Sequence, residues 1–132
     1  MKKLKKTVKS MVAEAKTKIS EINAKEAINL FKNDDVIFID IRDIRERQKL
    51  GFIPRSFHAP RGMLEFWVDP ESPYFKSIFD SDKKYVFHCA AGWRSALAVS
   101  TLKDMGFEAT HISDGFACWL NEKGPVEFKN KK

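Results

Sequence analysis

The sequence predicts a single α/β domain with a parallel sheet of about five strands flanked by helices. Two apolar runs, "VIFIDI" at 36–41 and "KYVFHC" at 84–89, are rich in β-branched and aromatic residues, which is typical of strands covered on both faces. Helical patterns alternate with these runs, as right-handed crossovers between parallel strands require. A length of 132 residues suits one compact domain, and no linker divides the chain.

The first half of the chain follows this alternation. A lysine-rich segment at 1–19 carries apolar residues at helical spacing and is expected to form an amphipathic helix. Asn23 followed by Glu26 has the pattern of a capping box, which predicts a helix beginning there. The first apolar strand then leads into "RDIRERQKL", a short helix ending near Gly51. The prolines within 52–60 exclude a long helix and leave a short strand or an extended connection.

The second half continues the pattern. "RGMLEF" and "SPYFKSIF" indicate two short helices separated by a turn around Pro70. The second apolar strand is followed by the helix "SALAVSTLKDM", which Gly106 closes. A third strand is expected at "EATHI", and a last helix, "GFACWLNEK", ends before Gly124.

The net charge of +6 comes from the two ends of the chain. Residues 1–19 carry seven lysines against one glutamate, the tail at 127–132 is again basic, and the body between them is slightly acidic. A nucleic-acid-binding fold would be expected to show a basic face within its body, so DNA and RNA are not expected as partners. The chain is therefore divided into an N-terminal helix (1–19), one domain (20–126) and a basic tail (127–132).

The N-terminal segment does not predict a membrane span. Lysines and Glu14 interrupt its apolar residues, so it lacks the core of a secretory signal, and no segment has the roughly 18 apolar residues that cross a bilayer. A cytoplasmic protein is expected. The N-terminal helix is expected to pack on its own domain or on a second copy, with partner docking or a membrane-surface role as alternatives.

Cys89 stands where the second apolar strand meets a loop of small residues. Ligands bind beyond the carboxyl ends of parallel strands, where Asp40 and His111 are also expected. "AAGWR" and Ser95 follow and open a helix, so successive N–H groups can turn inward to form an anion-binding nest. A free cysteine has a pKa of about 8.5, and helix N-termini lower it, which favours a nucleophilic thiolate. The alternative for such a residue is a small buried hydrophobe.

Three blocks of sequence, in the same order, resemble the rhodanese-like family of single-domain sulfurtransferases over about residues 20–126. "FIDIRDIRERQKLGFIPRSFHAP" is similar to the family's D-x-R, acidic residue and G-H-I-P-G-A-x-x-x-P block. "HCAAGWRS" resembles its C-x-x-G-x-R-S catalytic loop, and "SDGFACW" resembles its G-G-x-x-x-W helix start. The resemblance implies a rhodanese-like parallel sheet and a covalent cysteine persulfide intermediate, with no other cofactor.

The resemblance also implies roles for the loop residues. Cys89 would take a sulfane sulfur from thiosulfate or a similar small anionic donor and pass it to a thiol, a cyanide-like acceptor or a protein acceptor. Arg94 would orient the loop and help neutralise the donor. Backbone amides of 90–94 would stabilise the anionic persulfide. The loop residues expected to bind the transferred group are Ala90, Ala91, Gly92, Trp93 and Ser95.

Charged residues of the first block are expected to support the site. Asp40 and Arg42 occupy the D-x-R positions and would organise its wall, with Glu46 as structural support. Arg55 replaces a glycine of the family pattern. Together with Arg61 it is expected to add positive charge near the mouth of the site, and a solvated side chain is the alternative.

The histidines and the second cysteine are assigned structural roles. His88 should face away from Cys89 on its strand, so a packed and hydrogen-bonded histidine is expected there rather than a general base. His58 and His111 are also expected to be structural, and no metal site is predicted because no spacing matches one. Cys118 is expected to be buried, with a resolving thiol as the alternative.

Three functions compete at this point. The first is an enzyme that transfers sulfur through a Cys89 persulfide, and the second is a sulfur carrier loaded by a protein partner. The third is a phosphatase or an arsenate reductase. Related enzymes of that kind separate the cysteine and arginine by five residues, whereas four separate Cys89 from Arg94. The shorter loop should leave too little room for a tetrahedral oxyanion.

Overall fold

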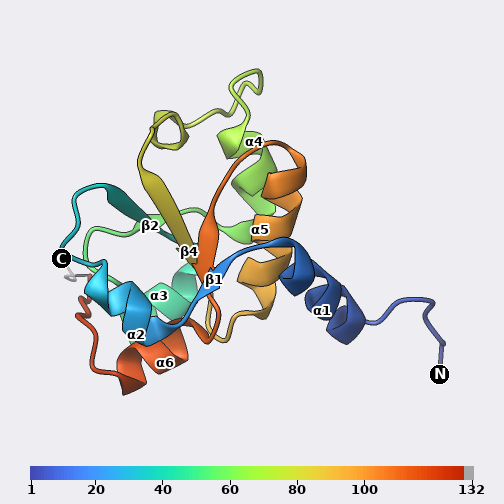
Figure 1. Ribbon diagram of the computed structural model, residues 1–132, viewed down its shortest axis with the longest axis horizontal. Coiled ribbons are helices and arrows are strands. Elements are labelled where there is room, and N and C mark those ends of the chain that lie inside the picture. The colour runs from blue at the N-terminus through green and yellow to red at the C-terminus, as the bar shows by residue number, and fades with distance from the viewer. Residues whose placement is uncertain (130–132) are drawn as a thin grey trace.

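The computed structural model describes residues 1–129 and contains one five-stranded sheet (Figure 1). All neighbouring strands are parallel, and their order across the sheet is β1-β5-β4-β2-β3. The strands are β1 (Glu21–Ile22), β2 (Val36–Asp40), β3 (Phe57–His58), β4 (Lys84–His88) and β5 (Thr110–Ile112). The structure confirms the predicted α/β class and the parallel sheet of about five strands.

Helices cover both faces of the sheet. In Figure 1, α2, α3 and α6 lie on one side, and α1, α4 and α5 lie on the other. Two short 3-10 helices, η1 and η2, belong to the long connection between β3 and β4. The bounds are α1 (Val8–Lys18), α2 (Ala24–Asn29), α3 (Ile44–Leu50), η1 (Arg61–Met63), α4 (Leu64–Val68), η2 (Ser77–Phe79), α5 (Trp93–Asp104) and α6 (Gly115–Asn121).

Reciprocal capping fixes where α2 and α3 begin. The Asn23 side chain accepts a hydrogen bond from the N–H of Glu26, whose carboxylate accepts one from the N–H of Asn23. Asp43 and Glu46 form the same box at the start of α3. These side chains satisfy N–H groups that have no partner within the helix. The predicted capping box at Asn23 is therefore present, and a second one occurs where β2 leads into α3.

Two apolar cores occupy the opposite faces of the sheet. One core packs β2 and β4 against α4 and α5 through Ile39, Phe87, Leu64, Val68, Ala98, Val99 and Leu102. The other packs the same strands against α2 and α6 through Phe38, Val86, Ala24, Ala27, Phe116 and Trp119. Successive strand residues point to opposite faces, so both faces of β2 and β4 are buried. This burial accounts for their apolar runs.

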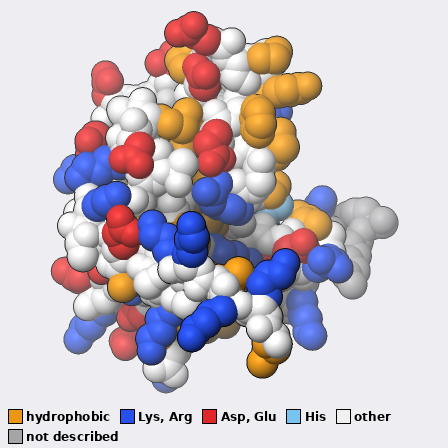
Figure 2. All heavy atoms as spheres, turned by 90° about the vertical axis from the view of Figure 1, so that its right-hand side faces the viewer, with side chains coloured by type: hydrophobic (Ala, Val, Ile, Leu, Met, Phe, Trp, Pro, Cys, Tyr) orange, Lys and Arg blue, Asp and Glu red, His pale blue; other side chains and the backbone are white. Residues whose placement is uncertain are grey.

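Helix α1 packs on α5 of its own domain (Figure 1). Val12 and Ala15 are buried against Ala96, while Val8 on the same helix is 54% exposed. Figure 2 shows the side of the molecule that carries α1, where lysine and arginine side chains gather over the lower half. Of the locations that the sequence left open for this helix, the structure favours packing within the chain.

The C-terminal segment runs back to the domain. An antiparallel bridge joins Glu127 to Phe52, with backbone hydrogen bonds of 2.9 Å in both directions. Residues 130–132 of the predicted basic tail lie outside the described part of the chain. Across residues 1–129, no helix has the length and apolar character needed to cross a membrane.

Replacing Val12 by alanine is expected to lower the free energy of unfolding by about 1 to 2 kcal/mol, because buried methyl groups lose their contacts with α5. The matched control is Val8→Ala in the exposed part of the same helix, which should change stability by less than about 0.5 kcal/mol. Urea unfolding followed by circular dichroism measures both variants. Equal losses would contradict the packing of α1 on α5.

Candidate active site

The carboxyl ends of β2 and β4 lie side by side and carry the candidate site. Asp40 and His88 are the last residues of these strands and pair in register, and Cys89 follows His88 directly. Helix α5 begins at Trp93, so the three-residue loop at 90–92 connects the cysteine to the helix. The helix starts two residues earlier than the sequence predicts. Its first turn is therefore close to the sulfur.

Two backbone N–H groups point at the sulfur of Cys89. The nitrogen of Gly92 lies 3.2 Å from Sγ, and the nitrogen of Ser95 lies 3.3 Å from it. The hydroxyl oxygen of Ser95 is 3.4 Å from the same sulfur. Cys89 is only 1% exposed, so water competes little for these groups. Donors that converge on a buried atom stabilise negative charge there.

Two glycines allow the loop to pack closely. Gly92 has a φ of 97°, and a Cβ at this position would overlap the carbonyl oxygen of Ser113. Gly115 has a φ of 71°, and a Cβ there would overlap the backbone of Ala90. The N–H groups of the two residues after Gly115 donate to the carbonyls of Cys89 and Ala90, at 2.9 and 3.1 Å. The loop is thus held between the N-termini of α5 and α6.

Arg94 forms a bidentate ion pair with Glu46 of α3, at 2.8 and 3.1 Å. The hydrogen bonds to Glu46 raise the pKa of Arg94, and they lower the pKa of the Glu46 carboxyl. The side chain of Arg94 is 42% exposed and Trp93 is 48% exposed, so both border solvent beside the loop. The ion pair fixes the start of α5 relative to α3.

A buried cluster of charges lies at the end of β2. The Arg42 guanidinium donates to both carboxylate oxygens of Asp40, at 3.0 and 2.8 Å, and both side chains are fully buried. Arg47 adds a hydrogen bond of 2.9 Å to Asp40. Burial acts to raise the pKa of Asp40, but the hydrogen bonds from Arg42 and the surrounding positive charge hold it well below its usual range. Arg42 also donates to the carbonyl of Gly51 and lies 4.1 Å from the centre of the Phe116 ring, so the cluster ties β2 to α3 and α6.

The side chain of His88 points to the face of the sheet that packs against α2 and α6. Its ring is fully buried and stacks on Phe116, with 5.8 Å between ring centres. Burial lowers the pKa of His88 to about 4, so the ring is neutral at neutral pH. Within residues 1–129 neither ring nitrogen has a hydrogen-bond partner. The packed histidine expected from the sequence is present, but its expected hydrogen bond is not, and the ring instead stacks on Phe116.

Comparison with known proteins agrees with this geometry. The rhodanese-like domain family matches residues 23–122. The chain belongs to this family.

Three similar proteins are informative about this rhodanese-like domain. A solved structure from Rhodopseudomonas palustris, described as a protein of unknown function and a possible tyrosine phosphatase, is 48% identical, has a TM-score of 0.93 and covers 96% of this chain and 98% of its own. YtwF of Bacillus subtilis, provisionally named a sulfurtransferase, is 30% identical over 107 residues, which are 81% of this chain and 93% of YtwF. The thiosulfate sulfurtransferase GlpE of Glaesserella parasuis is 25% identical over 109 residues, which are 82% of this chain and 93% of GlpE.

Arg55 and Arg61, which the sequence placed near the mouth of the site, lie at opposite ends of the strands. Arg61 follows β3 at the carboxyl edge, where its N–H donates to the carbonyl of Ile41 and its guanidinium pairs with Glu65 at 2.9 Å. Arg55 precedes β3 and therefore lies toward the amino edge. Its guanidinium donates to the carbonyl of Phe31 at 2.9 Å and lies 4.7 Å from the centre of that ring.

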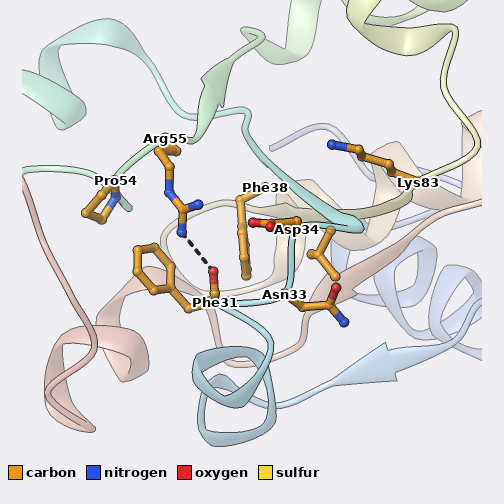
Figure 3. Close-up of a pocket in the computed structure, with 8 residues that line it drawn as sticks. Phe31, Asn33, Asp34, Phe38, Pro54, Arg55 and Lys83 are labelled. Atoms are coloured by element: carbon orange, nitrogen blue, oxygen red, sulfur yellow. Dashed lines mark hydrogen bonds between the residues drawn. The ribbon is translucent and has the colours of Figure 1, made fainter.

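Arg55 belongs to a pocket of about 380 Å³ that is separate from the Cys89 loop (Figure 3). The pocket is lined by residues that come just before β2 and β4, including Asn33, Asp34 and Lys83. The structure therefore does not bring Arg55 to the mouth of the site, where the sequence analysis expected it to add positive charge. The physical reason is strand direction, because residues before a parallel strand lie at the edge opposite its carboxyl end.

Sequence reasoning missed the surroundings of His111. The Nδ1 atom of this buried histidine lies 2.7 Å from the Ser95 hydroxyl, and its Nε2 lies 2.7 Å from a carboxylate oxygen of Glu21. His58, in contrast, lies 2.6 Å from the carbonyl of Arg42, as a structural histidine would. The sequence did indicate that His111 lies near the carboxyl end of a strand, where functional residues gather. Its partners depend on the order β1-β5-β4, which local sequence does not reveal.

The second cysteine lies on α6. Cys118 is a free thiol and is half-buried, whereas the sequence predicted a buried one. Partial burial raises its pKa, and the nearby Asp114 adds to this effect. The environment of Cys118 therefore favours the neutral thiol, unlike the donors around Cys89.

Gly92→Ala is expected to unfold the loop or to destabilise the domain by several kcal/mol, because a positive φ and an overlap with Ser113 act together. Gly106→Ala is the matched control. Gly106 has a φ of 94° but no atom within 4 Å of an added Cβ, so only backbone strain of about 1 kcal/mol is expected. Urea unfolding compares the two variants. A loss at Gly92 no larger than that at Gly106 would show that the close approach to Ser113 is wrong.

The buried neutral ring of His88 predicts a pH dependence of stability. The unfolded chain binds a proton at a pKa near 6.5 and the folded chain at about 4, so stability falls as the pH decreases through this window. The loss attributable to His88 should be about 2 to 3 kcal/mol between pH 7 and pH 4.5. His88→Leu should remove this part of the loss. Parallel stability curves for wild type and variant, measured by urea unfolding at each pH, would refute the assignment.

Proposed function

We propose that this protein is a sulfurtransferase that carries a sulfane sulfur as a persulfide on Cys89. The observation that carries the proposal is the convergence of the N–H groups of Gly92 and Ser95 on a buried sulfur in a rhodanese-like domain. These donors stabilise a thiolate before transfer and an anionic persulfide after it. Named sulfurtransferases at 25 to 30% identity support an enzymatic role of this kind.

The first half-reaction loads the cysteine. With thiosulfate as the small anionic donor, the Cys89 thiolate attacks the outer sulfur of the donor. A new S–S bond forms at Sγ, the S–S bond of thiosulfate breaks, and its electron pair leaves with sulfite. Charge is conserved, because a thiolate and a dianion become a persulfide anion and a dianion. Arg94 lies beside the loop, where its positive charge would attract the donor while its ion pair with Glu46 holds the loop in place.

The second half-reaction returns the enzyme to its starting state. A thiophilic acceptor, such as a small thiol, cyanide or a protein thiol, attacks the outer sulfur and releases the Cys89 thiolate. The burial of Sγ favours attack on the outer sulfur over attack on Sγ itself. A persulfide extends the side chain by an S–S bond of about 2.05 Å, so the sulfur to be transferred stands farther out than Sγ itself.

A phosphatase is the second candidate, because a structure at 48% identity is described as a possible tyrosine phosphatase. Two features favour sulfur transfer over phosphate hydrolysis. Only four residues separate Cys89 from Arg94, and the Arg94 guanidinium is already occupied by both oxygens of Glu46. A tetrahedral phosphoryl group would need a wider loop and a free fork of N–H donors.

The partners and location belong to the same proposal. A small anionic donor and a thiol acceptor suit a reducing compartment, and two free cysteines are typical of one, so the cytoplasm is the expected location. A protein that loads or unloads Cys89 is the alternative to a small-molecule partner. In that case turnover of thiosulfate should be weak while loading by the partner is rapid.

Brief treatment with thiosulfate is expected to add one sulfur atom to the peptide that contains Cys89 and to release sulfite. Cys89→Ser should lose both signals while keeping its fold, because a hydroxyl is a far weaker nucleophile than a thiolate. Cys118→Ser is the matched control and should load normally. Peptide mass spectrometry and sulfite release give the two readouts.

The same preparations should be tested for hydrolysis of p-nitrophenyl phosphate. Loading on Cys89 without phosphate release supports the proposal. Phosphate release that depends on Cys89, in a protein that takes no sulfur, would replace it with the phosphatase assignment.

A further inference from the structure

A buried chain of polar groups leads from the sulfur of Cys89 to the surface. Sγ lies 3.4 Å from the Ser95 hydroxyl oxygen, which lies 2.7 Å from Nδ1 of His111. Nε2 of His111 lies 2.7 Å from a carboxylate oxygen of Glu21. Ser95 and His111 are fully buried, whereas the Glu21 side chain is 28% exposed. Ser95 and His111 thus each have a hydrogen-bond partner on both sides.

The sheet order brings these residues together. Glu21 on β1 pairs in register with His111 on β5, which pairs with Phe87 on β4, two residues before Cys89. Side chains at the same register level in neighbouring strands share a face, and residues two apart on a strand share it too. Helix α5 covers this face and supplies Ser95. The chain therefore results from the fold and not from one flexible side chain.

The hydrogen-bonding capacity of the groups fixes the direction of each bond. A carboxylate only accepts, so Nε2 of His111 carries the proton that Glu21 accepts. In the neutral ring Nδ1 is then bare and accepts from the Ser95 hydroxyl. The hydroxyl oxygen is left to accept from the thiol of Cys89. In this arrangement the thiol keeps its proton.

We propose that His111, held by Glu21, takes up the proton of Cys89 through the Ser95 hydroxyl when the thiolate forms. The Sγ–H bond breaks as a new Oγ–H bond forms, and the original Oγ–H bond breaks as Nδ1–H forms. The result is a thiolate and an imidazolium, with no electron transferred. After the transfer the Ser95 hydroxyl donates to the sulfur instead of accepting from it. The thiolate then has a third donor beside the two N–H groups. His111 and Glu21 are positioning residues, because neither contacts the sulfur.

The surrounding charges set the balance between the neutral pair, a thiol and an imidazole, and the charged pair, a thiolate and an imidazolium. Burial lowers the pKa of His111, and the hydrogen bond and charge of Glu21 oppose this effect. Lys16 of α1 lies 3.6 Å from the Glu21 carboxylate and disfavours the imidazolium. On the other side, the positive charge of Arg94 lies beside the Cys89 loop and is paired with Glu46. The relay rests on the proposed role of Cys89 as nucleophile, but its test needs no sulfur donor.

The test follows both protons by titration in the Cys118→Ser background, so that Cys89 is the remaining thiol. Thiolate absorbance reports the sulfur, and 15N NMR of the imidazole reports His111. In His111→Gln we expect the midpoint of thiolate formation to move up by about one pH unit, equivalent to a roughly tenfold smaller thiolate fraction near neutral pH. Glu21→Gln should give a smaller shift in the same direction, with Glu14→Gln on α1 as the unaffected control.

Reciprocity separates a relay from mere packing. If the two groups share a proton, Cys89→Ser must shift the titration of His111 to lower pH, because the imidazolium loses its thiolate partner. Unchanged thiolate midpoints in Glu21→Gln and His111→Gln, or an unchanged His111 titration in Cys89→Ser, would overturn the relay. Should His111→Gln fail to fold, the other two variants decide. Intact coupling in a protein that takes no sulfur would support the relay and overturn only the sulfurtransferase assignment.

Discussion

The placement of two backbone N–H groups against the sulfur of Cys89 is the constraint on which the rest of the site depends. Backbone donors cannot be aimed by choosing a side chain, so the path of the chain from β4 to α5 must aim them. The left-handed conformation of Gly92 makes that path possible, and its contact with Ser113 leaves no room for a Cβ. Because the donors are fixed before any charge develops, little reorganisation is needed when the sulfur becomes an anion. In the proposed reaction the same geometry serves a thiolate and a persulfide.

Much of the remaining architecture holds this loop in place. Helix α6 binds the loop carbonyls from one side, and the pair of Arg94 with Glu46 fixes the first turn of α5 from another. The pair of Asp40 with Arg42 is buried, and breaking it would leave a charge without a partner, so it ties the end of β2 rigidly to its neighbours. The N-terminal helix contributes through its packing on α5 and through Lys16 beside Glu21.

The sequence was sufficient to predict the central strands and to single out Cys89 as the candidate nucleophile, because both inferences depend on local patterns. The run at 36–41 is apolar on both faces, and the residues after Cys89 form a compact motif. Strand β1 was missed because two residues cannot display a periodicity. Glu21 and His111 could not be linked from sequence, since their contact depends on the order of strands across the sheet. Arg55 was misplaced for a related reason: a family pattern gives its position along the chain but not the edge of the sheet that its side chain reaches.

The most direct test of the account is a high-resolution crystal structure of the protein after brief treatment with thiosulfate. We expect one additional atom bonded to Sγ at about 2.05 Å, the length of an S–S bond, with the N–H groups of the loop directed toward the sulfur pair. An unmodified Cys89 after this treatment would contradict the central claim, because a donor that reaches a thiolate in this loop should leave its outer sulfur on Sγ.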